Sequence, residues 1–149
     1  MLFHIIIGFI FPWIVGVYLF RKQKRLFIIF YPIATATSFF INEIGFNYFW
    51  EMDINYKQES LTALPYDLGL YPILGILFIC AIHFKKISIL ITFIVFTLGT
   101  TFGELIAVLL GKLVYRHEWN VIWSGVSYIM SYSIVYLYYK IVRKFIIFD

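Results

Sequence analysis

One carboxylate lies within a stretch of the sequence that is otherwise apolar enough to dissolve in hydrocarbon. Glu104 lies in the stretch TTFGELIAVLLG (100–111), in which every other residue is apolar, a glycine or a threonine. A charge inside a bilayer costs several kcal/mol unless something receives it. Glu104 must therefore hold a proton, pair with another group or face a polar cavity, and each of these is a chemistry that a function could use.

Other ionisable residues fall at the same depth. Counted from the basic residue that marks one end of each apolar run, Glu43, Asp67 and Glu104 each lie 18 positions along their run. His4 lies 17 positions along the first run. At 1.5 Å per residue, 18 positions span about 27 Å, close to the roughly 30 Å thickness of a hydrocarbon core. The sequence therefore predicts a layer of three acids and one histidine near one membrane surface.

We expect the three acids to form one polar cluster, capped from the loop VYRHEWN (114–120). The candidate cluster comprises Glu104, Glu43, Asp67, His117 and Arg116, with His4, Thr100 and Asn42 as weaker members. Carboxylates this close cannot all ionise cheaply, so at least one is expected to hold a proton or to share a bound cation. Asp67 also has a structural interpretation, because Pro65 could open its helix and an acid in the first turn favours the helix dipole.

The motifs of common catalytic sites are missing from the sequence. It has no HExxH pair and no Gly-x-Ser-x-Gly elbow, and its single cysteine, Cys80, lies in an apolar run. No catalytic residue is therefore predicted. A metal site of His117 and the three acids would suit a hard or borderline divalent ion, which keeps a metal-dependent membrane enzyme open. No other cofactor is expected.

The whole chain has the composition of an integral membrane protein. It is 62% hydrophobic and 13% charged over 149 residues, whereas soluble domains carry about 25% charged residues. The net charge of +4 does not indicate a nucleic-acid partner, because the basic residues sit in short clusters between apolar runs. The N-terminal run lacks a basic n-region and a cleavage site, so it is expected to be a retained span.

Five apolar runs are long enough to cross a bilayer as helices. The predicted fold class is an all-α, polytopic integral membrane bundle, a single transmembrane domain over 1–149. Its spans are expected at about 2–20, 26–49, 65–84, 87–112 and 120–140. With five spans, nine of the 12 lysines and arginines fall on one side. The positive-inside rule then places the N-terminus outside and the C-terminus in the cytoplasm.

Small and hydroxylated residues form stripes at helical spacing. The stripes are Thr35, Ser38 and Asn42; Thr97, Thr100 and Glu104; and Ser124, Ser127 and Ser131. In lipid, such faces let helices approach closely and hydrogen-bond across the contact. We therefore expect the first and third stripes to face other helices, and the large aromatic residues Phe39, Phe40 and Phe96 to face lipid or fill gaps.

From about Asn42 onward, the chain resembles a family of small, uncharacterised five-helix membrane proteins from spore-forming bacilli and clostridia. The resemblance rests on LTALPYDLGLYPILG (61–75), with its Leu-Pro-Tyr-Asp and Tyr-Pro pairs, and on GELIAVLLGKLVYRHEWNVIWSGVSYIMSY (103–132). It implies a plasma-membrane protein of a Gram-positive bacterium, and it supplies no activity.

Three kinds of function stay open. The first is a structural or accessory subunit, in which the acid layer is a hydrogen-bonded latch and a second copy or another membrane subunit is the partner. The second is binding or transport of a proton, a cation or a small cationic solute, although the chain lacks the internal repeat common in transporters. The third is the metal-dependent enzyme. A polar stripe facing lipid would favour the first, and a polar pocket the second.

Overall fold

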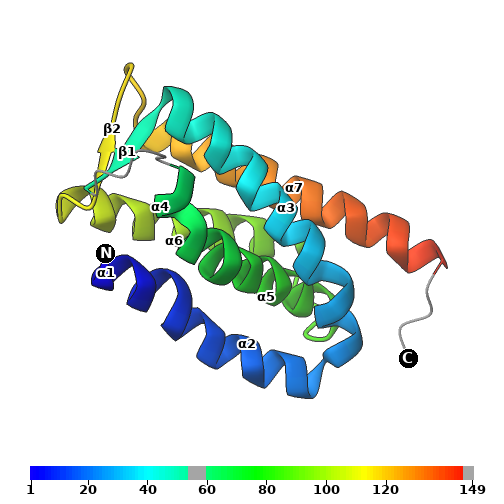
Figure 1. Cartoon of the computed structure of the whole chain (residues 1–149). Helices are drawn as coiled ribbons and strands as arrows, with labels where there is room; N and C mark the ends of the chain where they lie inside the picture. Colours follow the sequence, from blue (N-terminus) through cyan, green and yellow to red (C-terminus); the bar gives the residue numbers. More distant parts are fainter. Residues whose placement is uncertain (54–59, 146–149) are drawn as a thin grey trace.

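The computed structural model describes residues 1–53 and 60–145 and is almost entirely helical (Figure 1). Within these residues, five helical spans are long and apolar enough to cross a membrane. In chain order they are α1 (Leu2–Ile5), η1 (Ile6–Ile10) and α2 (Phe11–Lys22); α3 (Lys24–Tyr48); α4 (Ser60–Pro65), η2 (Tyr66–Leu70) and α5 (Tyr71–His83); α6 (Ile89–Leu109); and α7 (Val121–Phe145). The segments η1 and η2 are single π-helical stretches inside the first and third spans.

The central helix of the bundle is α5, which contacts α2, α3, α6 and α7. Its residues Ile76, Phe78 and Ile79 are fully buried, and they share a core with Phe30 of α3 and Tyr132 of α7. The fourth span, α6, lies at the edge of the bundle and packs mainly on α7 and α5. Among the described helices, none packs on the other side of α6.

A short β-ribbon closes one end of the bundle. Strand β1 (Trp50–Met52) pairs antiparallel with β2 (Leu113–Tyr115). Gly45 allows the ribbon to fold against α3, because a Cβ at this position would lie 1.7 Å from the Trp50 ring. The N-terminus lies at the ribbon end, whereas the α2–α3 turn and the end of α7 lie at the opposite end (Figure 1).

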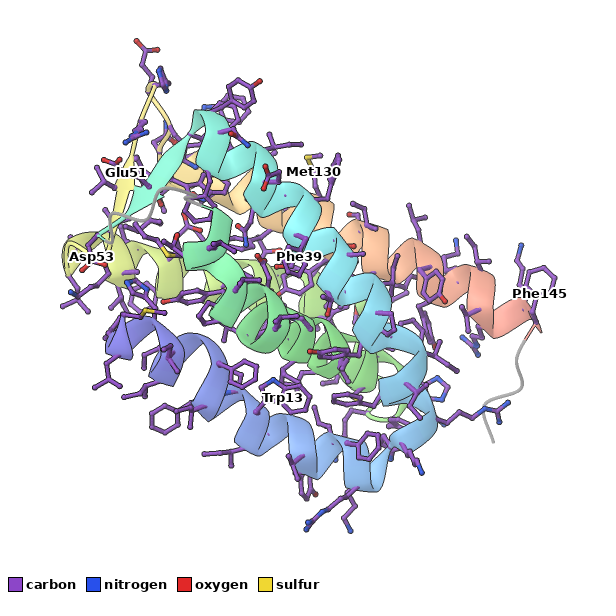
Figure 2. All side chains as sticks on the ribbon, viewed as in Figure 1. Trp13, Phe39, Glu51, Asp53, Met130 and Phe145 are labelled. Carbon is purple, nitrogen blue, oxygen red and sulfur yellow. The ribbon has the colours of Figure 1, made fainter. Side chains whose placement is uncertain are left out.

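The π-helical segments lie where the first and third spans cross. Pro12 and Pro72 follow them, and a proline has no N–H for the carbonyl four residues earlier. The Leu68 carbonyl, left without this donor by Pro72, accepts hydrogen bonds from Trp13 Nε1 at 2.9 Å and Tyr31 Oη at 2.8 Å. These two bonds satisfy the carbonyl without water and join three spans. Trp13 is labelled on the first span in Figure 2.

The backbones of these two spans touch at the crossing. A Cβ on Gly69 would lie 2.1 Å from the Gly8 carbonyl oxygen and 2.8 Å from Phe9 Cα. A Cβ on Gly8 would lie 3.1 Å from Pro65. The glycine at position 69 is therefore required by the close approach of two backbones.

The third span begins earlier than its sequence indicated, and the fifth ends later. A start near residue 65 was expected, but α4 begins at Ser60 and continues through Pro65 into η2. Pro65 is tolerated because it lies close enough to the helix start to interrupt only one early hydrogen bond. Asp67 thus lies about two turns inside a continuous helix, and the helix-dipole interpretation of this residue is wrong. The fifth helix runs to Phe145 instead of about 140.

Candidate functional site

Glu104 ties α6 to β2 and α7 through three hydroxyl groups. Tyr115 Oη donates to Glu104 Oε1 at 2.7 Å, and Ser124 Oγ donates to the same oxygen at 2.5 Å. Tyr128 Oη donates to Oε2. A hydrogen bond to an ionised carboxylate is roughly twice as strong as one between neutral groups. The carboxyl group of Glu104 is therefore hydrogen-bonded by neutral donors from two neighbouring elements, β2 and α7.

Two aromatic residues fix the direction of this network. Trp119 Nε1 donates to Ser124 Oγ at 2.9 Å, which leaves the serine hydrogen for Glu104. Tyr71 Oη lies 3.4 Å from Tyr128 Oη, and Tyr71 is the donor because Tyr128 already donates to the carboxylate. Burial raises the pKa of the Tyr115 hydroxyl on β2, so this group remains a donor at neutral pH.

Asp67 is held by α3 and not by the Glu104 network. It is only 1% exposed, and its Oδ1 accepts hydrogen bonds from Ser38 Oγ and, at 2.6 Å, from Asn42 Nδ2. Glu43 follows Asn42 directly but is exposed, and it accepts a hydrogen bond at 3.1 Å from Asn47 of its own helix. Among the described residues, the three acids expected to cluster share no hydrogen-bond donor.

A third polar group attaches the start of the chain to the ribbon end of the bundle. His4 is 2% exposed, with Nδ1 2.9 Å from Tyr66 Oη and Nε2 2.7 Å from Asp53 Oδ1. Lys112 Nζ donates to Asp53 Oδ2 at 2.7 Å. The hydrogen bond from Lys112, and then that from His4, lowers the pKa of Asp53 against the opposing effect of burial. Figure 2 labels Asp53 at this end of the bundle, beside the first helix.

The two residues expected to cap the acids lie elsewhere. Arg116 forms an ion pair with Glu51 of the ribbon, and His117 Nδ1 lies 2.7 Å from the Tyr48 carbonyl oxygen. Arg116 directly follows β2 and continues its alternation, in which successive side chains point to opposite faces, whereas His117 has a positive φ of 49° and turns out of the strand direction. Tyr115 takes the face toward α6 and binds its carboxylate, so Arg116 takes the other face. The capping prediction is corrected accordingly.

The first and third polar stripes meet other helices through part of their length. Ser38, Asn42 and Ser124 are buried and make the contacts described above. Ser127 and Ser131 instead donate to carbonyl oxygens of their own helix, at 2.8 and 2.9 Å. Phe39 and Phe40 are exposed, and Phe96 packs against Phe78 and Tyr132 as a gap-filling ring, which is the other alternative expected for these residues.

A cavity of about 690 Å³ lies between the first span and α6, with the third span behind it. Its walls come from α1 and η1, from η2 and α5, from one face of α6, from Tyr128 of α7 and from the ribbon end, where Met52, Lys112 and Leu113 lie. The residues with polar groups on these walls are His4, Tyr66, Tyr71, Thr100, Glu104, Lys112 and Tyr128. The remaining lining is apolar or glycine. Small-molecule sites in proteins have this size and this mixture of an apolar lining with few polar groups.

The α6 wall of this cavity can be reached from the side of the bundle. Gly99 and Gly103 lie on it, and a Cβ added to either would have no neighbouring atom within 4 Å. Val95 and Leu110, on the same wall, are each 58% exposed. A GxxxG pair normally marks a face on which another helix packs closely, but here it borders the cavity.

Among the described residues, no group of three His, Cys, Asp or Glu side chains is close enough to hold a metal ion. Comparisons with protein-family models, with curated protein sequences and with solved structures find no match to this chain. The geometry of the cavity and of the groups around it is therefore the basis for a function.

Several residues of the Glu104 network and of the His4 group carried no prediction: Asp53, Tyr66, Tyr71, Lys112, Tyr115, Trp119 and Tyr128. Tyr128 had a usable signal, since it follows Ser124 by four positions and so lies on the same helical face. Tyr66 and Tyr71 stand beside Pro65 and Pro72 in the motifs that carry the family resemblance. No sequence signal joins Asp53 to His4, because their contact depends on how the chain packs.

Proposed function

We propose that this chain is a five-span plasma-membrane protein that binds an amphipathic small molecule in the outer half of the bilayer, in the cavity beside Glu104. The observation that carries the proposal is a side-opening cavity that combines apolar walls with a carboxylate. The α6 wall runs from Val95 to Leu110, about 22 Å at 1.5 Å per residue. This length suits an alkyl chain or a set of fused rings lying parallel to the helices.

The orientation proposed has the N-terminus and the β-ribbon outside and the C-terminus in the cytoplasm. Basic residues support it, because they gather at the α2–α3 turn, at the α5–α6 turn and at the end of α7, all at the end opposite the ribbon. The family resemblance supports a Gram-positive plasma membrane.

Cysteine labelling in intact cells tests this orientation. In a Cys80→Ser background, Glu118→Cys in the exposed loop before α7 is expected to react with a membrane-impermeant maleimide. Gln23→Cys, in the turn between α2 and α3, is expected to react only after the cells are opened. Labelling of position 23 from outside would reverse the proposed orientation.

Filling the cavity tests the binding function. Gly103→Leu projects a side chain into open space, so it should block the cavity without a clash and with a gain in helix propensity. We expect the wild-type protein, purified in a mild detergent, to retain an amphipathic molecule that native mass spectrometry detects as an added mass. The Gly103→Leu variant should lose this adduct.

Leu98→Phe is the matched control, since Leu98 is a 63% exposed residue of α6 outside the cavity lining. It enlarges a side chain of the same helix on a face outside the cavity and should leave the adduct in place. An adduct that survives Gly103→Leu, or a wild-type protein that retains no amphiphile from its native membrane, would count against the binding function.

A second candidate is an accessory subunit, which the Gly99 and Gly103 face of α6 also favours. Such a face can receive a helix from a second copy of the chain or from another membrane subunit. In that case Gly103→Leu would lower the oligomeric mass measured by light scattering in detergent. A monomeric wild-type protein that loses only its small-molecule adduct would exclude a second copy as the occupant.

A further inference from the structure

We infer that the ligand of this cavity is a lipophilic organic cation, held by the Glu104 carboxylate and the aromatic rings around it. This inference rests on the proposed binding function and names the chemistry of its ligand. It is carried by the charge of the cavity wall, by the rings that line the cavity and by its access from the side.

The first step concerns charge. Within the described part of the chain, Glu104 is bound by the hydroxyls of Tyr115, Ser124 and Tyr128 and has no cationic partner. Among the described residues of the wall, the other charged side chain is Lys112, and Asp53 already binds it at 2.7 Å, as Asp53 also binds His4. The negative charge of Glu104 is therefore the one that the walls leave uncompensated, and a cation is the ligand that it favours.

The second step concerns hydrogen-bonding capacity. A carboxylate offers about four lone-pair positions. Three hydroxyl donors occupy three of them, so the carboxylate can accept one more hydrogen bond or interact directly with a nearby cation. The three donors also hold the carboxylate in place before a ligand arrives. Binding then does not incur the entropy cost of ordering this side chain.

The third step concerns the rings. Five aromatic side chains line the cavity: Phe3, Tyr66, Tyr71, Phe96 and Tyr128. The face of an aromatic ring attracts an organic cation within about 6 Å of its centroid, and the attraction is larger where water is absent. An aromatic lining beside a carboxylate favours a bulky, weakly hydrated cation over a small metal ion, because the latter demands several oxygen ligands.

The fourth step concerns access. The exposed α6 residues Val95, Ile106 and Leu110 border the cavity, so a solute dissolved in the bilayer can enter from the side. Lipophilic cations concentrate in membranes through their apolar surface. An anionic amphiphile of the same shape would place its charge near Glu104 and be repelled.

The test uses two probes of the same shape and opposite charge, tetraphenylphosphonium and tetraphenylborate, with wild-type protein in nanodiscs of a zwitterionic lipid. Equilibrium dialysis in sodium buffer, corrected for uptake by empty nanodiscs, gives each Kd. We expect the phosphonium to bind about tenfold more tightly than the borate or better, and Glu104→Gln to weaken the phosphonium by about tenfold. Gly103→Leu should abolish phosphonium binding.

Each other result has a definite meaning. Equal binding of both probes, lost in Gly103→Leu, would keep the cavity as a binding site but overturn a cationic ligand. Unchanged phosphonium affinity in a folded Glu104→Gln variant would also overturn it. Failure of both probes, together with an amphiphile adduct insensitive to Gly103→Leu, would overturn the binding function itself. The comparison of the two probes on wild-type protein needs no variant to fold.

Discussion

Glu104→Leu is expected to lower the free energy of unfolding by about 2–4 kcal/mol, because it leaves three hydroxyl donors without their acceptor. Tyr115, Ser124 and Tyr128 would then lose this acceptor, and the contacts left to them, Ser124 Oγ to Tyr115 Oη at 3.1 Å and Tyr71 Oη to Tyr128 Oη at 3.4 Å, replace only part of it. The contacts that join α6 to β2 and α7 at the ribbon end should loosen together. Thermal unfolding in detergent, followed by circular dichroism, measures the change.

Glu104→Gln separates the structural role of this residue from its charge. The amide keeps one carbonyl oxygen for two donors, and its NH₂ group can donate to a tyrosine hydroxyl, so we expect a loss of only about 1 kcal/mol. Glu43→Leu is the control, since Glu43 is an exposed carboxylate on α3 bonded only within its own helix. It should change stability by no more than about 0.5 kcal/mol. Equal losses for Glu104→Leu and Glu43→Leu would contradict the role assigned to Glu104.

Gly69→Ala is expected to cost about 3 kcal/mol or to prevent assembly of the first span, because the added methyl would overlap the Gly8 carbonyl. A flexible side chain could move away, but this neighbour is backbone inside a helix. Separating the spans would also pull Trp13 from the Leu68 carbonyl and leave that group unsatisfied. Unfolding in detergent and tryptophan fluorescence report the two effects.

Gly103→Ala is the matched control for Gly69→Ala, since it makes the same substitution in a helix where the new methyl meets nothing. It should be neutral or stabilising by up to about 1 kcal/mol, the difference in helix propensity between the two residues. If the two variants unfold alike, the close contact between η1 and η2 does not exist in solution.

Because helix rise is constant, counting residues predicts a depth along each span. Asp67, Glu104 and His4 were placed in one layer by counting residues, and all three make side-chain hydrogen bonds toward the ribbon half of the bundle. Rotation about the helix axis could not be predicted in the same way. Successive helical residues point about 100° apart, so Asn42 faces Asp67 while Glu43, the next residue, is exposed. A count of positions cannot separate these two neighbours.

Asn42 and the polar stripes were predicted, but the tyrosine partners of Glu104 were missed because they come from other elements. Tyr115 reaches Glu104 from a strand. The two strands are too short for an alternating hydrophobic pattern to predict them. The predicted third span is too short because proline is typical of the first turn of a helix, so Pro65 indicated a helix start. The ribbon also determines where Arg116 and His117 lie, and its register depends on the pairing of residues 61 to 65 positions apart.

The central claim is that an amphipathic molecule occupies the cavity between the first span and α6, and the position of a bound molecule tests it most directly. Crystals grown with an alkyltrimethylammonium whose chain carries a terminal bromine would give that position by anomalous scattering. We predict a bromine peak enclosed by η1, α5 and α6, near Leu74 and Val95, with the ammonium group toward Glu104. A bromine peak only on the outer surface of the bundle, or side chains filling the cavity so that no ligand fits, would contradict the account.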